Sequence, residues 1–244
     1  MIDNWECPYC GVEMVEAENL DRSRSVEHFI PNALLSIRRS PRDGDFFACR
    51  RCNSKKSKID HVLAVVARTQ SPDADLAADA LAEAVTSSKK SSAKFVRMLR
   101  TAREAPDGMH MTIPIDGRDL FDYLTFLAKG QHFRHTGKVF DPRETVALIQ
   151  FANKQVMTAY KTRYRIDHWS DPIVDLTSNP NSEACGRDEC VIWSREHNYL
   201  FVLHHFTAVM IQVLPVSRKN RTQARSLERR MLVDFSARSR NPRR

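Results

Sequence analysis

The sequence contains very little glycine. Its 244 residues include 7 glycines, about 3% of the chain and under half of the roughly 7% that is usual. So little glycine argues against glycine-rich barrels, solenoids and low-complexity tracts, and it favours a fold rich in helix. The chain is 42% hydrophobic and 28% charged, which excludes wholesale disorder. Its length lies between one large domain and two modest ones.

The sequence also lacks a long apolar run. The most apolar window, residues 199–214, is interrupted by His204, His205, Thr207 and Gln212. It therefore falls short of the roughly 20 apolar residues that a membrane-spanning helix needs. The first six residues, MIDNWE, form neither a basic nor an apolar signal region. We therefore expect a cytoplasmic protein that does not associate with membranes.

Positive charge is concentrated in two segments. The formal net charge is +8, and residues 217–244 hold ten basic and two acidic residues, which equals that whole excess. Residues 34–58 hold eight basic and two acidic residues. A basic tail can be a solvated chain end, or it can steer a polyanion by displacing counterions from phosphates. We favour the second interpretation, and it indicates a nucleic-acid partner.

Four of the six cysteines form two Cys-x2-Cys pairs. These cysteines are Cys7, Cys10, Cys49 and Cys52. In a chain without a secretion signal, this spacing predicts a structural zinc site, because four thiolates at about 2.3 Å complete a tetrahedral shell. A redox dithiol or chance pairing is the alternative. Such a site contributes on the order of 10 kcal/mol to folding. Cys185 and Cys190 are expected to be ordinary thiols, and a second metal site shared with a nearby histidine is the alternative.

The residues around these pairs follow a specific order. SVEHFIP at residues 25–31 lies between the pairs, and NSKKSK at residues 53–58 follows the second pair directly. The combination Cys-x2-Cys, Glu-His-x-x-Pro, Cys-x2-Cys-Asn-x-x-Lys resembles the HNH endonucleases, also called ββα-metal nucleases, over roughly residues 5–68. The resemblance implies a β-hairpin and a helix that present a histidine and one divalent cation to a scissile phosphate, with the zinc knuckles pinning the hairpin to the helix.

The resemblance also implies roles for three residues. His28 matches the general base, while Glu27 and Asn53 match ligands of the catalytic cation. A neutral imidazole can deprotonate water, and a cation can neutralise the charge that builds on the phosphate. Oxygen ligands favour Mg²⁺ or Mn²⁺. The alternatives are a structural histidine at position 28 and a helix N-cap at position 53. Glu27 and His28 converge only if the strand is irregular, because neighbours in a strand point to opposite faces.

One feature of the family is missing. Its middle asparagine, which braces the loop that holds the base, has no counterpart in residues 41–48. Asp45 or Asp43 could instead brace His28 through its other ring nitrogen. The open alternative is a degenerate site that binds without cutting.

Basic side chains at the start of the predicted helix fit contacts to a phosphate backbone. These residues are Arg50, Arg51, Lys55, Lys56 and Lys58. A solvated helical face is the alternative. Phosphate contacts position a duplex without reading its bases, so they predict no recognition sequence.

Beyond residue 68 the patterns predict further helices. One opens with Ser71 as N-cap and Pro72 at its first position, and a serine-rich break at 87–92 precedes another over 95–102. A helix over 119–129 is expected to stop at Gly130, which places His132 and His135 in a loop.

The last part of the chain is expected to combine one helix with strands. The Asp141-Pro142-Arg143-Glu144 sequence predicts a helix from there to about residue 160. Residues 191–205 read as a β-hairpin, and residues 207–214 as a third strand.

The predicted fold class is α+β, with a small zinc-stapled ββα-metal module at the N-terminus. We expect a nuclease module at 1–68, a mainly helical region at 69–180, antiparallel strands at 181–216 and a basic tail at 217–244. The expected function is a metal-dependent DNA endonuclease, with RNA an open alternative as substrate. The competing hypotheses are a non-catalytic zinc-dependent nucleic-acid-binding protein and a subunit of a defence or mobile-element complex, acting with a companion protein or as a homo-oligomer.

Overall fold

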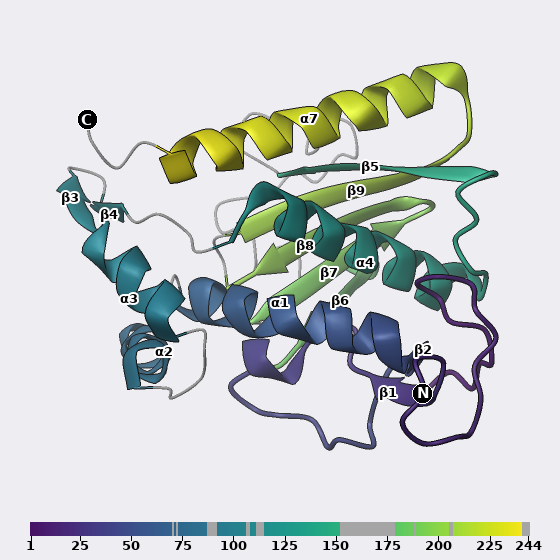
Figure 1. Cartoon of the computed structure of the whole chain (residues 1–244), viewed down its shortest axis with the longest axis horizontal. Helices are drawn as coiled ribbons and strands as arrows, with labels where there is room; N and C mark the ends of the chain where they lie inside the picture. Colours follow the sequence, from purple (N-terminus) through teal and green to yellow (C-terminus); the bar gives the residue numbers. More distant parts are fainter. Residues whose placement is uncertain are drawn as a thin grey trace.

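Figure 1 shows the computed structural model of the chain. The structure describes residues 1–69, 71, 73–86, 92–105, 108–110, 115–151, 179–187, 189–204 and 207–240. Within these residues the fold is mixed α and β, with five α-helices and antiparallel sheets, as expected for the α+β class.

The N-terminal segment forms a β-hairpin followed directly by a helix. Strand β1 (Arg24–Glu27) pairs antiparallel with β2 (Phe46–Cys49), and α1 (Arg50–Arg68) begins at the next residue. A short 3-10 helix, η1 (Asn32–Leu34), lies in the connection between the strands and packs against α1. The helix predicted after the second cysteine pair is therefore confirmed, although it begins three residues earlier than Asn53.

Two helices and a small hairpin follow. Helix α2 spans Ala74–Thr86, α3 spans Ser92–Arg100, and β3 (Arg103–Ala105) pairs with β4 (Gly108–His110). The carboxylate of Asp73, rather than Ser71, caps α2, because it accepts the N–H groups of Asp75 and Leu76. The predicted proline position and residues 87–91 of the predicted break lie outside the described residues.

Helix α4 (Gly117–Thr136) is longer than the sequence predicted. It passes through Gly130 and ends at Gly137, which adopts a left-handed φ of 69°. The predicted stop at Gly130 is therefore wrong, and His132 and His135 lie in the helix rather than in a loop. Glycine at position 130 instead lets the helix backbone approach the Phe29 ring closely, because an added Cβ would lie 2.6 Å from that ring.

The largest sheet has five antiparallel strands in the order β5-β9-β8-β7-β6. The strands are β5 (Thr145–Phe151), β6 (Ser182–Cys185), β7 (Cys190–Arg195), β8 (Asn198–Leu203) and β9 (Thr207–Pro215). The predicted hairpin and third strand are confirmed. The helix predicted after Asp141 is wrong over residues 145–151, because pairing of this segment with β9 outweighs the local capping signal. Residues 152–160 of that prediction lie outside the described residues.

The basic tail is a helix that packs on the rest of the chain. Helix α7 (Arg218–Arg240) contacts β5 and α4. Figure 1 shows α7 lying along the upper side of the sheet and α1 along the lower side of α4. One continuous hydrophobic core runs from Cys7 to Met231, so the N-terminal segment and the sheet are packed together.

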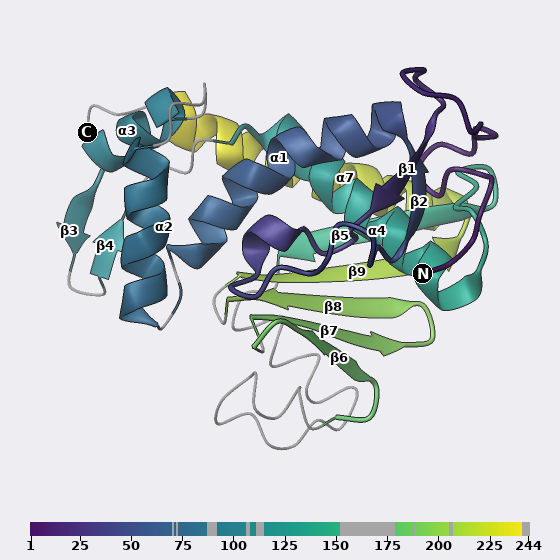
Figure 2. The ribbon, with the colours of Figure 1, turned by 90° about the horizontal axis from the view of Figure 1, so that it is seen from below.

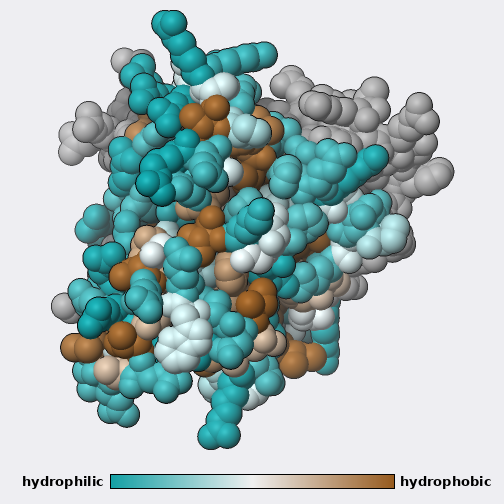
Figure 3. All heavy atoms as spheres, turned by 90° about the vertical axis from the view of Figure 1, so that its right-hand side faces the viewer, coloured by the Kyte–Doolittle hydropathy of each residue, from teal (hydrophilic) through white to brown (hydrophobic). Residues whose placement is uncertain are grey.

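The surface at the N-terminal end of the molecule is mainly hydrophilic. In Figure 3 its apolar atoms form small, separate patches among polar and charged side chains. Exposed large apolar residues at this end of the chain include Met1, Trp5 and Leu20. None of the described helices combines the length and apolar character that a membrane span requires.

We expect Gly130→Ala to destabilise the protein by about 1–3 kcal/mol, the usual cost of overpacking a core. Phe29 is fully buried between Phe46 and Phe201, so its ring has little room to move. Urea denaturation followed by circular dichroism measures the change. Gly137→Asn is the matched control, because nothing lies within 4 Å of its Cβ and asparagine tolerates a left-handed conformation. A Gly130→Ala protein as stable as wild type would contradict the close contact.

Candidate functional site

The two Cys-x2-Cys pairs converge in space, as the spacing predicted. The four Sγ atoms of Cys7, Cys10, Cys49 and Cys52 all lie within 4.8 Å of one another. The Sγ atoms of Cys10 and Cys49 are 3.7 Å apart, close to the edge of about 3.8 Å in a tetrahedron with bonds of about 2.3 Å. The cluster could therefore bind a metal such as zinc. It joins the first loop to the end of β2 and the start of α1.

The thiols of this cluster differ in acidity. A hydrogen bond from Cys52 outweighs burial and lowers the pKa of Cys7 to about 5. Burial raises the pKa of Cys49 to about 11. The cluster without metal thus ionises readily at Cys7, whereas the raised pKa values of Cys49 and Cys52 oppose loss of their protons. A divalent cation supplies the positive charge that stabilises further thiolates, which is why four crowded cysteines fit zinc.

A surface pocket of about 220 Å³ lies where β1, η1 and α1 meet. Three of the predicted site residues, Glu27, His28 and Asn53, line this same pocket, although Asn53 lies 25 positions after His28 in the sequence. The complete lining consists of Val26, Glu27, His28, Pro31, Asn32, Ala33, Asn53, Ser57, Asp60 and His61. Figure 2 views this face, with η1 in front of the sheet and α1 beside it.

His28 is half-buried at the edge of the pocket. Burial and the nearby Arg39 guanidinium lower its pKa, and Asp45 opposes them only in part. The imidazole is therefore neutral near pH 7, as a general base must be. Its Nδ1 atom is buried and has no hydrogen-bond partner among the described residues.

The bracing predicted for Asp45 takes a different form. Its Oδ2 atom accepts the backbone N–H of Phe29 at 2.8 Å and the Arg39 guanidinium at 3.1 Å. Asp45 therefore holds the backbone beside His28 rather than the imidazole ring. Asp43 affects His28 only through its negative charge, which works against the lowering of the His28 pKa.

Asn32 is a bracing residue that the sequence did not reveal. Its Nδ2 donates to the Arg39 carbonyl at 3.0 Å, and its Oδ1 accepts the Arg39 N–H at 3.1 Å. The Arg39 side chain in turn donates to the Ile30 carbonyl. These bonds close the loop that follows His28. The only sequence signal for this role was an asparagine directly after Pro31, which lies earlier in the chain than the middle asparagine of the HNH motif.

Lys56 lies on the buried side of α1. Its Nζ is 3.0 Å from Glu27 Oε1 and 3.1 Å from Asp60 Oδ2, and its side chain is 1% exposed. The prediction that Lys56 contacts phosphate is therefore wrong, because its ammonium is already held by two carboxylates inside the protein. Asp60 was missed, although its i,i+4 spacing from Lys56 on a helix is the signal for such a pair.

Glu27 points into the protein and meets the loop that holds the first two cysteines. Tyr9, between the first two cysteines, donates its hydroxyl to Glu27 Oε1 at 3.1 Å. Burial raises the pKa of Glu27 although Lys56 opposes the shift, and burial likewise raises the pKa of Asp60. Glu27 Oε2 is buried and has no hydrogen-bond partner among the described residues. Two carboxylates thus share one ammonium, and when both are ionised one negative charge is uncompensated within the group.

Asn53 lies inside α1, so it is not the helix N-cap that the sequence left as an alternative; Cys49 occupies that position. Its Nδ2 donates to Ser25 Oγ at 2.8 Å and to the Val26 carbonyl at 2.9 Å, which ties α1 to β1. The other arm of the amide, Oδ1, is the atom that a cation would bind.

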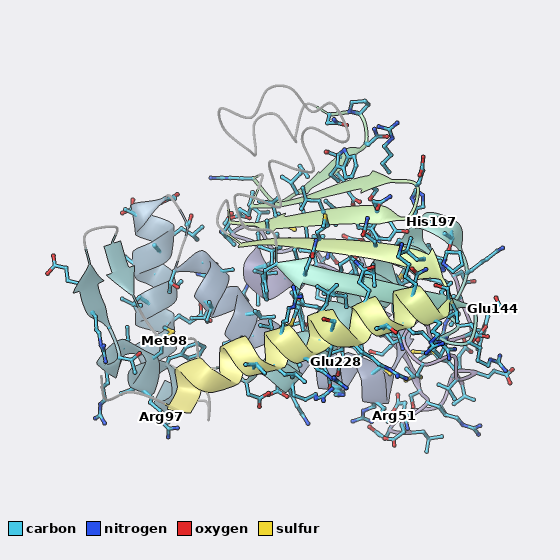
Figure 4. The ribbon with its side chains drawn as sticks, turned by 90° about the horizontal axis from the view of Figure 1, so that it is seen from above. Arg51, Arg97, Met98, Glu144, His197 and Glu228 are labelled. Carbon is cyan, nitrogen blue, oxygen red and sulfur yellow. The ribbon has the colours of Figure 1, made fainter. Side chains whose placement is uncertain are left out.

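The remaining predicted phosphate contacts are exposed on α1: Arg50, Arg51, Lys55 and Lys58. Lys55 forms an ion pair with Asp122 of α4 at 2.6 Å, and Arg50 donates to Asn19. Figure 4 labels Arg51 at the N-terminal end of α1.

The C-terminal sheet holds the wall of the pocket. The Leu34 carbonyl of η1 accepts a hydrogen bond from His204 Nε2 at 2.7 Å. The Ser36 N–H donates to both oxygens of Glu189, at 2.9 and 3.0 Å. His204 and Glu189 are buried, and no sequence motif pointed to either of them.

Comparisons of this chain with protein-family models, with curated proteins and with solved structures found no match. The contacts of the cysteine cluster and of the His28 pocket are therefore the basis for assigning a function.

We expect one zinc ion per chain, and we expect Cys49→Ser to lose it. Because a four-cysteine site contributes on the order of 10 kcal/mol, the variant should unfold its N-terminal segment. Elemental analysis and thermal denaturation measure both effects. Cys185→Ser is the matched control, since this half-buried thiol lies outside the cluster and should leave the zinc content unchanged. Wild-type protein without zinc, or full zinc content in Cys49→Ser, would contradict the site.

We expect Lys56→Met to destabilise the protein by about 3–5 kcal/mol, because it leaves two buried carboxylates without their cation. Lys55→Met should change the free energy of unfolding by less than about 1 kcal/mol, because Lys55 is 58% exposed and its ion pair lies at the surface. Urea denaturation of the two adjacent variants makes the comparison. Equal effects at the two positions would refute the buried group.

Proposed function

We propose that this protein is a metal-dependent DNA endonuclease of HNH type. One observation carries the proposal. A single pocket is lined by a neutral histidine, by an asparagine whose amide oxygen could bind a cation, and by two carboxylates that share one buried lysine ammonium. These residues are His28, Asn53, Glu27, Asp60 and Lys56. The uncompensated charge and the unpartnered Glu27 Oε2 favour a hard divalent cation, Mg²⁺ or Mn²⁺, in the pocket.

In the proposed reaction His28 removes a proton from the attacking water. Its Nδ1 is buried, so Nε2 is the atom that takes the proton. Asn53 and Glu27 would hold the cation, which neutralises charge on the phosphate and on the leaving 3′ oxygen when bound. Asp45 and Asn32 keep the backbone around His28 in place.

The exposed cations on α1 support a nucleic-acid substrate. Arg50, Arg51 and Lys58 lie on the same helix as Asn53 and are free of the buried cluster around Lys56. Such contacts bind the phosphate backbone of any sequence, and DNA is the proposed substrate class by resemblance to the family.

One observation favours a second candidate, a zinc-dependent nucleic-acid-binding protein without catalysis. Catalytic and metal-binding histidines are usually oriented by a partner on the second ring nitrogen. Among the described residues His28 Nδ1 has none. The same candidate could serve as a subunit of a defence or mobile-element complex.

We expect wild-type protein to nick supercoiled plasmid in the presence of Mn²⁺ or Mg²⁺, and His28→Ala to reduce the rate by at least about 100-fold, the lower range for loss of a general base. Gel electrophoresis over time measures nicking. The matched control is His135→Ala, because this exposed histidine lies in α4 outside the pocket. Zinc content should stay the same in both variants.

Two results would contradict the proposal. One is plasmid that stays intact with wild-type protein while a gel shift shows binding, which would establish the non-catalytic candidate. The other is equal cleavage by wild type and His28→Ala, which would remove His28 from the mechanism.

A further inference from the structure

Helix α7 has an apolar inner face and a basic outer face. Met231 is buried, and Ala224 and Leu227 are half-buried, where the helix packs against β5 and α4. The opposite side carries a row of four exposed arginines: Arg218, Arg221, Arg225 and Arg229. We call these four residues the α7 arginine row. Figure 4 shows α7 in front of the sheet when the molecule is seen from above.

The row is regular along the helix axis. Its members are three, four and four residues apart, so at 1.5 Å per residue they follow one another at about 4.5–6 Å and span about 16 Å. Lys219 and Arg230, also exposed, flank the row. The acidic residue of this stretch, Glu228, is paired with Arg118 of α4 at 2.8 Å, so its charge is already neutralised.

Two surface hollows of about 600 and 550 Å³ follow this face of α7. Arginines of the row line them together with the hydroxyl residues Ser217, Thr222 and Ser226. Arginine, serine and threonine are among the side chains that contact phosphate oxygens in complexes with nucleic acids.

We propose that the α7 arginine row binds the sugar-phosphate backbone of a nucleic acid. One strand presents a negative charge for every 3.4 Å or so of helix axis, so a row of this length faces several phosphates at once. An anionic membrane is a poorer match, because an interfacial helix turns its apolar residues outward, whereas α7 turns Ala224, Leu227 and Met231 inward.

This surface is separate from the His28 pocket. Seen from below, η1 and α1 lie in front (Figure 2), whereas seen from above α7 lies in front (Figure 4). The row therefore contacts a second segment of nucleic acid, away from the phosphate that would enter the pocket. The inference goes beyond the proposed function, because the row would bind even if the pocket does not cut.

The test uses full-length, zinc-loaded protein carrying His28→Ala, freed of excess metal and kept in buffer without Mg²⁺ or Mn²⁺, so that no cleavage occurs. Fluorescence anisotropy with a labelled 30-base-pair duplex of mixed sequence gives the affinity over a series of KCl concentrations. In Arg221→Gln/Arg225→Gln/Arg229→Gln the slope of log K against log salt should become shallower by about 2.7, or about 0.9 for each lost phosphate contact.

The matched control removes the same charge elsewhere: Lys138→Gln/Arg187→Gln/Arg195→Gln, just after α4, between β6 and β7, and at the end of β7. Its slope should stay close to that of the parent protein. Circular dichroism checks that both triple variants are folded. An unchanged slope in the α7 variant, or an equal decrease in the control, would overturn the proposal. Binding of the parent protein to phosphatidylserine vesicles but not to the duplex would overturn it in favour of a membrane surface.

Discussion

The N-terminal part of this protein depends on the two buried ion pairs that the Lys56 ammonium forms. This ammonium joins Glu27 at the end of β1 to Asp60 on α1, and Tyr9 ties the first cysteine loop to the Glu27 carboxylate. Buried charges are costly unless paired, so the hairpin, the helix and the cysteine loop are held to one arrangement. The adjacent His28 can share a pocket with Asn53 only because that arrangement is fixed.

The sequence predicted those features that depend on local spacing. Two Cys-x2-Cys pairs predicted the cysteine cluster, the motif around them predicted the helix after the second pair, and the residue pattern predicted the C-terminal hairpin. The errors arose where distant contacts decide the structure. Gly130 lies inside a helix because the Phe29 ring occupies the space that a side chain at position 130 would need. Residues 145–151 form a strand because they pair with β9.

The same distinction holds for the candidate site. His28 and Asn53 were predicted from a motif and lie in one pocket, whereas Lys56 matched the motif but turned inward. The direction of the Lys56 side chain depends on which face of α1 packs against β1, and a single sequence does not reveal that face. The contributions of His204 and Glu189 had no local signal, since these residues bond to backbone groups 170 and 153 positions away.

The bonds from His204 to η1 and from Glu189 to Ser36, just after η1, also set the order in which the protein can mature. The wall of the pocket cannot be completed until β7 and β8, which lie far downstream of η1 in the chain, have been synthesised and folded. Such long-range closure raises contact order and slows folding. During translation the N-terminal hairpin and helix therefore emerge from the ribosome well before the pocket beside them is complete.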